Sequence, residues 1–458
     1  MSTLTQPDFA QLAGRVERIT LPDSEAYDEL RRSRIWNQRL ACERRPAAII
    51  SVRDAAEASA AIRFARANGL KLTVRGHGHN YEAAAARDGS VMLDISPMET
   101  LEIDLETRTA WAGAAVNGRQ LLEALEPHRL AFPIGHCSNV PLSGYVLSGG
   151  FGWNAGEWGA ATANVLAIEL VTASGEHLRV DAEHHADLFW AARGSGSGFF
   201  AAVLRYKLKL HDLPATAYTW SATFTADSAP ALAPWLSRAT AEADPSTEII
   251  CLVGPDHHSG RPAVIVRASS VGHSEAEARG KVSRFCDPPQ EAAIIEGPKG
   301  EAMGFAELTK LSAMPNGKRV YADQLWSDAS LGDMLLAVWH LADIPVTSSS
   351  INLISPGAGV RIPHCDGADA ALSVGGSAGA GLYAMWDDAA DDERHMDWAR
   401  EADAALARFR TGRYVGEANL GAGLDRVEQC FAPGVLDRIE RLRAQWDSDN
   451  LFGGFPVG

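Results

Sequence analysis

The sequence predicts an α+β protein organised in two parts, and three observations lead to this prediction. From Ile49 onward, segments whose apolar residues recur at every second position alternate with segments of helical spacing. Glycine-rich stretches, which let a backbone turn tightly or approach a ligand, occur before Leu213. After Leu213 strands are separated by helices and no glycine-rich loop of the earlier kind follows, so we expect a second domain there.

The first part is predicted to alternate helices and short strands. Residues 51–70 predict a helix, because small apolar residues fall on one face and Gly69 stands where a C-terminal cap belongs. A strand over residues 72–74 runs directly into Arg75-Gly-His-Gly-His-Asn80. Further strands are expected over residues 91–95, 101–105, 109–116, 165–172 and 203–210. Two long helices are expected later, one at about residues 396–409 and one starting at Pro433.

Composition and charge exclude several classes of protein. The chain has 458 residues, 46% of them hydrophobic, and a net charge of −16 without a run of basic residues. We therefore expect neither nucleic acid nor an anionic membrane surface as a partner. The six cysteines form no CxxC pair, which argues against a zinc ribbon or a thioredoxin-like site. The N-terminal residues lack the basic and apolar regions of a signal peptide, and no apolar run is long enough to span a bilayer, so we expect a cytoplasmic protein.

The segment Arg75-Gly-His-Gly-His-Asn80 predicts a loop that holds an anion. Two glycines beside basic groups, directly after a strand, can expose backbone N–H groups to a pyrophosphate. Neither the GxGxxG nor the P-loop pattern is present. His77 and His79 suggest a metal site as an alternative, but no third imidazole lies within the next few residues. We expect no metal.

A second glycine-rich stretch makes the first one more specific. It contains Gly135-His-Cys-Ser-Asn-Val140 and Ser148-Gly-Gly-Phe-Gly152. Together with residues 75–80, these motifs resemble the berberine bridge enzyme-like branch of the vanillyl-alcohol oxidase, or p-cresol methylhydroxylase, flavoprotein superfamily. The resemblance implies bound FAD, attached at its 8α-methyl group through His79. By position, Cys137 matches the cysteine that some members bond to flavin C6.

Later motifs follow in the order of that family, so the resemblance extends from about Pro46 to the C-terminus. They are Val171-Thr-Ala-Ser-Gly175, Asp187-Leu-Phe-Trp-Ala-Ala-Arg-Gly194, Ala384-Met-Trp-Asp-Asp388 and Arg413-Tyr-Val-Gly-Glu417. The implied fold has an FAD-binding domain in two pieces, residues 1–213 and 414–458. Between them, residues 214–413 are expected to form a substrate-binding domain, an antiparallel sheet backed by helices whose open face covers the isoalloxazine ring.

Some positions depart from the family pattern. His77 replaces a glycine, Tyr145 stands where many members have a histidine, and Ser138 and Pro141 replace a proline and a glycine around Cys137. The bond to His79 is compatible with these changes. Whether Cys137 bonds to the flavin or is simply a small apolar residue stays open at this stage.

The resemblance also implies which residues surround the cofactor. The cofactor-binding candidates are Arg75, Gly76, His77, Gly78, His79, Asn80, His136, Cys137, Val140, Gly144, Tyr145, Gly149, Gly150, Gly152 and Trp153. Val140 occupies the position that controls access of oxygen to the flavin in this family, and valine favours an oxidase. His136 is either part of the cavity wall or an ordinary loop histidine.

Four residues are candidates for taking a proton from the substrate: Glu417, Tyr414, Tyr383 and Tyr321. Each has a structural alternative, since a strand tyrosine is often a packing residue and Glu417 can be a surface acid. Residues 414–417 are expected to lie on a strand. Tyr414 and Glu417 would then point to opposite faces, and only one of them would reach the cavity.

The expected function is FAD-dependent oxidation of an alcohol, an amine or a phenol-like organic molecule, with oxygen as electron acceptor and hydrogen peroxide as product. Two alternatives stay open. One is a dehydrogenase that passes electrons to a protein or quinone. The other is a protein that keeps the fold and the flavin for a non-redox task, such as a cyclisation or a binding role.

Overall fold

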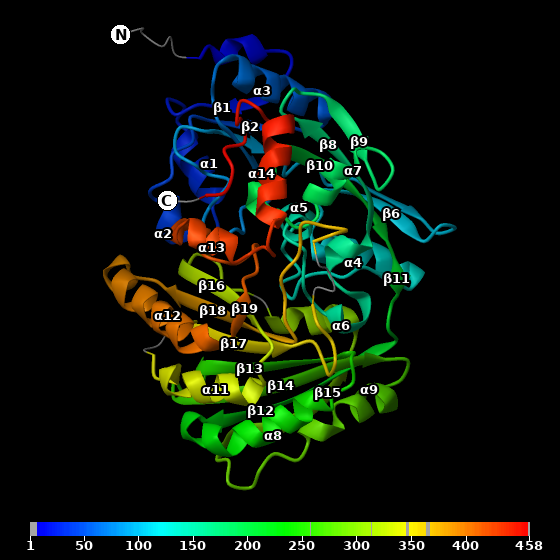
Figure 1. Cartoon of the computed structure of the whole chain (residues 1–458), viewed down its shortest axis with the longest axis vertical. Helices are drawn as coiled ribbons and strands as arrows, with labels where there is room; N and C mark the ends of the chain where they lie inside the picture. Colours follow the sequence, from blue (N-terminus) through cyan, green and yellow to red (C-terminus); the bar gives the residue numbers. More distant parts are fainter. Residues whose placement is uncertain (1–6, 257, 313, 345–347, 363–366, 457–458) are drawn as a thin grey trace.

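The computed structural model describes residues 7–256, 258–312, 314–344, 348–362 and 367–456. Within them the chain folds into two small sheets toward one end of the molecule and a large sheet toward the other (Figure 1), together with a two-stranded ribbon. All strands of the small sheets come from Arg18–Asp212, and all strands of the large sheet come from Thr216–Gly412. The α+β prediction is confirmed. The chain passes from the small sheets to the large sheet near Leu213, the residue at which the sequence predicts the domain boundary. The division into domains itself stays a prediction.

The first small sheet positions the predicted anion loop. Its strand order is β1 (Arg18–Thr20), β2 (Ala48–Ser51), β4 (Val91–Asp94) and β3 (Leu72–Arg75), with β4 parallel to both β2 and β3. Helix α3 (Ala55–Ala67) joins β2 to β3; the Asp54 side chain caps it by accepting a hydrogen bond from the backbone N–H of Glu57. Strand β3 therefore ends directly at the start of residues 75–80.

The second small sheet is antiparallel. Its order is β5 (Leu101–Asp104), β6 (Thr109–Gly113), β10 (Ala201–Lys209), β8 (Val165–Thr172) and β9 (His177–Val180). Strands β5 and β6, at the strands predicted over residues 101–105 and 109–116, pair as an antiparallel hairpin. The ribbon pairs β7 (Leu130–Ala131) with β11 (His211–Asp212).

The large sheet has eight antiparallel strands. Their order is β15 (Ile294–Met303), β12 (Thr216–Thr225), β14 (Pro262–Gly272), β13 (Thr247–Pro255), β17 (Ser350–Ser355), β18 (Ala378–Trp386), β16 (Arg319–Ser327) and β19 (Arg410–Gly412). Helices α8 (Ala229–Ala241), α9 (Glu275–Lys281), α11 (Leu331–Val338) and α12 (Asp392–Leu406) cover one of its faces (Figure 1). Apolar side chains of α8, α11 and α12 form one buried core with that face. The other face is left for the cavity described below.

The chain returns to the small sheets after β19. Helix α14 (Val435–Trp446) packs against α7 (Ala186–Ala191), and the backbone N–H of Leu72 donates to the carbonyl of Leu451 (Figure 1). The remaining α-helices are α1 (Tyr27–Ser33), α2 (Gln38–Ala41), α4 (Gly118–Leu125), α5 (Leu142–Leu147), α6 (Ala155–Trp158), α10 (Phe305–Leu308) and α13 (Leu424–Glu428). Among the residues described, no helix has the length and apolar character to cross a bilayer, and no cluster of His, Cys, Asp and Glu could hold a metal ion.

Candidate active site

A cavity of about 410 Å³ lies between the loops of the small sheets and the open face of the large sheet. Strand alternation explains which residues the large sheet contributes, because every second side chain points to the same face. These residues are Glu248 and Ile250 on β13, Gln324 and Trp326 on β16, Asn352 and Ile354 on β17, and Gly381 and Tyr383 on β18. The opposite wall includes residues 72–81, most of residues 135–152, parts of residues 196–203 and the C-terminal segment 414–417.

The loop of residues 75–80 is held rigidly against the protein. The buried guanidinium of Arg75 donates to Asp94 Oδ1 at 2.9 Å and to the carbonyl of Arg34 at 3.1 Å. Gly78 has φ +76°, and a Cβ at this position would lie 2.1 Å from the same carbonyl. Glycine is therefore required there. Two nitrogens of Arg75 hold the loop in place through these hydrogen bonds and are not available to bind an anion.

His79 enters the cavity from this loop as a neutral imidazole. Burial, and then the nearby charges of His77 and Arg75, lower the pKa of His79 to about 4. Its ring stacks on Trp36, with 6.1 Å between the ring centres. At neutral pH an unprotonated ring nitrogen is therefore available as a nucleophile.

His136 and Cys137 lie on the facing loop, and both line the cavity. His136 Nε2 lies 2.8 Å from each carboxylate oxygen of Glu248, and its ring packs edge-on against Trp153. Burial alone lowers the pKa of His136, but the Glu248 carboxylate outweighs it and raises that pKa above the usual value. His136 is thus part of the cavity wall, paired with a residue of the large sheet.

Three of the predicted cofactor residues stand behind the wall and shape it. Gly149 and Gly150 have φ values of +119° and +78°, and neither lines the cavity. Trp153 is fully buried beneath His136. Gly152 does line the cavity, and a Cβ there would lie 1.9 Å from the carbonyl of Ile134. Because Gly152 has no side chain, its backbone can pass close to the backbone of Ile134 and Gly135 at the cavity edge.

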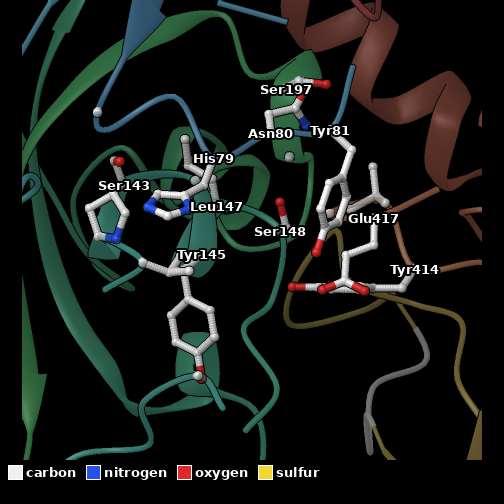
Figure 2. Close-up of a pocket in the computed structure, with 18 of the residues that line it drawn as sticks. His79, Asn80, Tyr81, Ser143, Tyr145, Leu147, Ser148, Ser197, Tyr414 and Glu417 are labelled. Atoms are coloured by element: carbon white, nitrogen blue, oxygen red, sulfur yellow. The ribbon is translucent and has the colours of Figure 1, made fainter. Parts of the chain in front are cut away.

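Tyr414 and Glu417 both reach the cavity, so the predicted strand over residues 414–417 was wrong. Strand β19 ends at Gly412, and the backbone N–H of Glu417 and of Ala418 both donate to the carbonyl of Tyr414. A turn of this helical kind places residues three apart on the same side, whereas a strand would place them on opposite sides. Figure 2 shows both side chains beside Tyr81, across the cavity from His79 and Tyr145.

Glu417 is hydrogen-bonded and its acidity is perturbed. The Tyr383 hydroxyl donates to Glu417 Oε2 at 2.6 Å. Burial raises the pKa of Glu417 above the usual range of a carboxyl group, while the bond from Tyr383 and the charge of His136 act in the opposite direction. Tyr414 accepts a hydrogen bond from the backbone N–H of Gly150 at 3.2 Å. The cavity therefore contains a carboxyl group held by a phenol, an arrangement suited to accepting a proton.

Tyr321 lies on the opposite face of the large sheet. It belongs to the core formed with the covering helices, and the guanidinium of Arg400 on α12 lies 5.7 Å from its ring centre. Odd-numbered positions of β16 face α12, whereas Gln324 and Trp326 face the cavity. We therefore do not propose Tyr321 as a catalytic residue.

Several cavity residues escaped the sequence analysis. Tyr81 follows the predicted loop by one residue, and its ring contacts both Trp36 and Tyr383. Phe151 lies inside a recognised glycine-rich stretch but was not singled out. Trp326 carries no motif; only the period-two spacing of its strand, once the cavity face is known, would have found it.

The cavity fits a flavin dinucleotide on two local observations. A Cβ on Gly144, which lines the cavity, would meet no atom within 4 Å, so the backbone of α5 is open to a ligand there. The hydroxyl oxygen of Ser197, also in the wall, is buried without a hydrogen-bond partner among the described residues. A bound group with polar atoms would satisfy it.

Comparison with known proteins decides the identity of the cofactor. Residues 46–181, which include His79 and Cys137, match a family described as an FAD binding domain. The FAD-linked oxidoreductase nodO of Hypoxylon pulicicidum is 25% identical, with 96% of each chain covered. This chain is an FAD-linked oxidoreductase with the vanillyl-alcohol oxidase fold.

Other relatives of this FAD-linked oxidoreductase agree. The (R)-6-hydroxynicotine oxidase of Paenarthrobacter nicotinovorans is 27% identical, covering 95% of this chain and 94% of that protein. The solved structure of BBE-like 1 from Physcomitrella patens superposes with a TM-score of 0.85 at 18% identity and covers 98% of each chain. The predictions of the family, the fold and FAD are confirmed.

Proposed function

We propose that this oxidoreductase is an oxidase that acts on an alcohol, an amine or a phenol-like organic molecule and delivers the electrons to oxygen, producing hydrogen peroxide. The observation that supports the proposal most directly is the Tyr383–Glu417 hydrogen bond in the same cavity as His79 and Cys137. When bound, FAD supplies the acceptor for a hydride from a substrate carbon. The residues of the chain must then hold the flavin, orient the substrate and accept its proton.

We assign attachment of the flavin to His79. The neutral imidazole expected from its lowered pKa suits formation of a bond to carbon. Stacking on Trp36 limits how the ring can turn. Cys137, on the facing loop and partly accessible in the cavity, is the candidate for a second bond. The open face of the large sheet, in this proposal, covers the flavin ring.

We assign acceptance of the substrate proton to Glu417. Its carboxylate must be ionised to act as a base, and the hydrogen bond donated by Tyr383 stabilises that ionised form. Tyr414 and Tyr81 stand beside it in the wall (Figure 2). A substrate hydroxyl or amine placed among these groups could transfer its proton to the Glu417 carboxylate.

Reaction of the reduced protein with oxygen tests the proposal without knowledge of the substrate. The holoprotein is reduced anaerobically with dithionite and mixed with air-saturated buffer, and flavin absorbance and peroxide are recorded. We expect complete reoxidation within seconds and one peroxide per flavin. Replacement Val140→Leu should slow reoxidation, because Val140 lines the cavity and a larger side chain narrows access to it. Reoxidation that takes hours, together with rapid reduction of a quinone or dye, would instead identify a dehydrogenase.

A further inference from the structure

The large sheet presents few free polar groups to the cavity. Among the described residues, four polar side chains of its strands line the cavity, and each is already hydrogen-bonded within the protein. Both oxygens of Glu248 face His136, and the Tyr383 hydroxyl donates to Glu417. The Gln324 amide donates to the carbonyl of Leu325 and accepts from the backbone N–H of Tyr414. In the fourth, Asn352, the side-chain oxygen accepts a hydrogen bond from the Ser350 hydroxyl at 2.8 Å. A substrate rich in hydroxyl groups would therefore find little pairing on this wall.

Aromatic and aliphatic side chains from both walls line the cavity beside these polar groups. The rings of Phe151 and Trp326 meet edge to face, with 4.9 Å between their centres and 83° between their planes. Tyr414 completes the cluster, with its ring centre 4.8 Å from Phe151 and 6.2 Å from Trp326. All three line the cavity, as do Ile354 and Ile362. Tilted aromatic rings of this kind offer edges and faces to another ring.

The cluster of Phe151, Trp326 and Tyr414 adjoins the proton acceptor. Tyr414 belongs to it and lies beside Glu417 in the turn that follows β19 (Figure 2). A ring seated against the cluster would thus carry an attached hydroxyl or amine toward Glu417. The cluster offers apolar contact, and Glu417 offers a proton acceptor beside it.

We infer that the substrate is a molecule with a planar aromatic ring, seated against Phe151 and Trp326 with its reacting hydroxyl or amine at Glu417, and not a carbohydrate. This inference rests on the proposed function, because it takes Glu417 as the acceptor of the substrate proton. It narrows the broad class of alcohols, amines and phenol-like molecules to aromatic ones. Recognition depends on ring contact with this wall rather than on a network of hydrogen bonds.

Binding to the anaerobic holoprotein tests the inference, with benzyl alcohol and D-glucose as probes. Each probe is titrated while the flavin absorbance is followed, and either a spectral shift or bleaching counts as binding. We expect saturation by benzyl alcohol at a concentration at least about tenfold lower than by D-glucose. Equal or tighter saturation by D-glucose, or no saturation by benzyl alcohol, would overturn the inference.

Variants separate ring contact from general damage. Trp326→Ala should raise the half-saturating concentration of benzyl alcohol about tenfold, and Trp326→Phe, which keeps a ring, should raise it less. Trp111→Ala is the matched control, because Trp111 on β6 lies outside the cavity wall and stacks with Arg205. FAD content verifies folding of each variant. If Trp326→Ala binds benzyl alcohol as tightly as the wild type, the aromatic cluster is not the binding surface. The titration requires no oxygen, so failure of the oxidase proposal is read separately from failure of this inference.

Discussion

At the scale of single residues, the proposed chemistry depends on how burial and hydrogen bonds set the protonation of His79 and Glu417. The buried imidazole stays neutral and the carboxyl group becomes a weaker acid than usual. Motif position was enough to select both residues as candidates from the sequence, and both line the cavity. It could not predict that Tyr383 donates to Glu417, because the two lie on elements that only the fold brings together.

Replacement Tyr383→Phe should move the acid limb of the pH profile of kcat/KM to higher pH. Glu417 acts as a base only when ionised, so activity falls as the pH drops through its pKa. The hydrogen bond from Tyr383 lowers the pKa of Glu417, whereas burial raises it. Without this hydrogen bond the pKa of Glu417 should therefore rise. Glu417→Gln should remove the limb and lower kcat/KM by about 10²–10⁴-fold.

The matched control is Tyr321→Phe, a loss of the same hydroxyl on the opposite face of the sheet. It should leave the acid limb where it is in the wild type. A limb that stays in place in Tyr383→Phe, or moves equally in Tyr321→Phe, would show that Glu417 is not the titrating base.

At the scale of elements, glycines decide how closely backbone and ligand approach. The sequence predicted the glycine-rich segments as ligand loops, and their position around the cavity agrees. It did not predict the turn over residues 414–417, because two candidate side chains three positions apart can belong to a strand or to a turn. Strand alternation predicts that Tyr321 and Trp326 lie on opposite faces of β16. It does not predict which of the two faces borders the cavity.

Replacements of two cavity glycines should separate folding from cofactor binding. Gly144→Ala meets no atom and lies within α5, where alanine favours the helix by about 1 kcal/mol, so the apoprotein should keep or raise its Tm. The added methyl group enters the cavity and should lower FAD content. In Gly152→Ala the methyl group would overlap the carbonyl of Ile134, and we expect a loss of about 1–3 kcal/mol in stability. Differential scanning calorimetry and flavin absorbance after denaturation measure both effects. Full FAD content in Gly144→Ala would refute the placement of the cofactor at α5.

At the scale of the whole molecule, the cavity exists because distant segments are tied together around it. The buried side chain of Asn37 donates to the carbonyls of Tyr81 and Val320, and so joins the segment just after the loop of residues 75–80 to β16. His136 and Glu248 form a second tie. Sequence motifs predicted the fold and the cofactor, since those motifs are local. The pairing of walls was not predictable, because it depends on contacts between residues far apart in the chain.

The mass of the intact protein after acid denaturation tests the central claim most directly. A covalent flavin stays with the chain under these conditions, and a flavin held by contacts alone is lost. Wild type, His79→Ala, Cys137→Ala and the double variant are compared, each supplied with FAD. We predict that the wild type and Cys137→Ala are heavier than the bare chain by one FAD. If His79→Ala loses the adduct, His79 forms the single bond; if only the double variant loses it, both residues are bonded. A wild-type protein of bare chain mass, or an adduct lost in Cys137→Ala alone, would contradict attachment through His79.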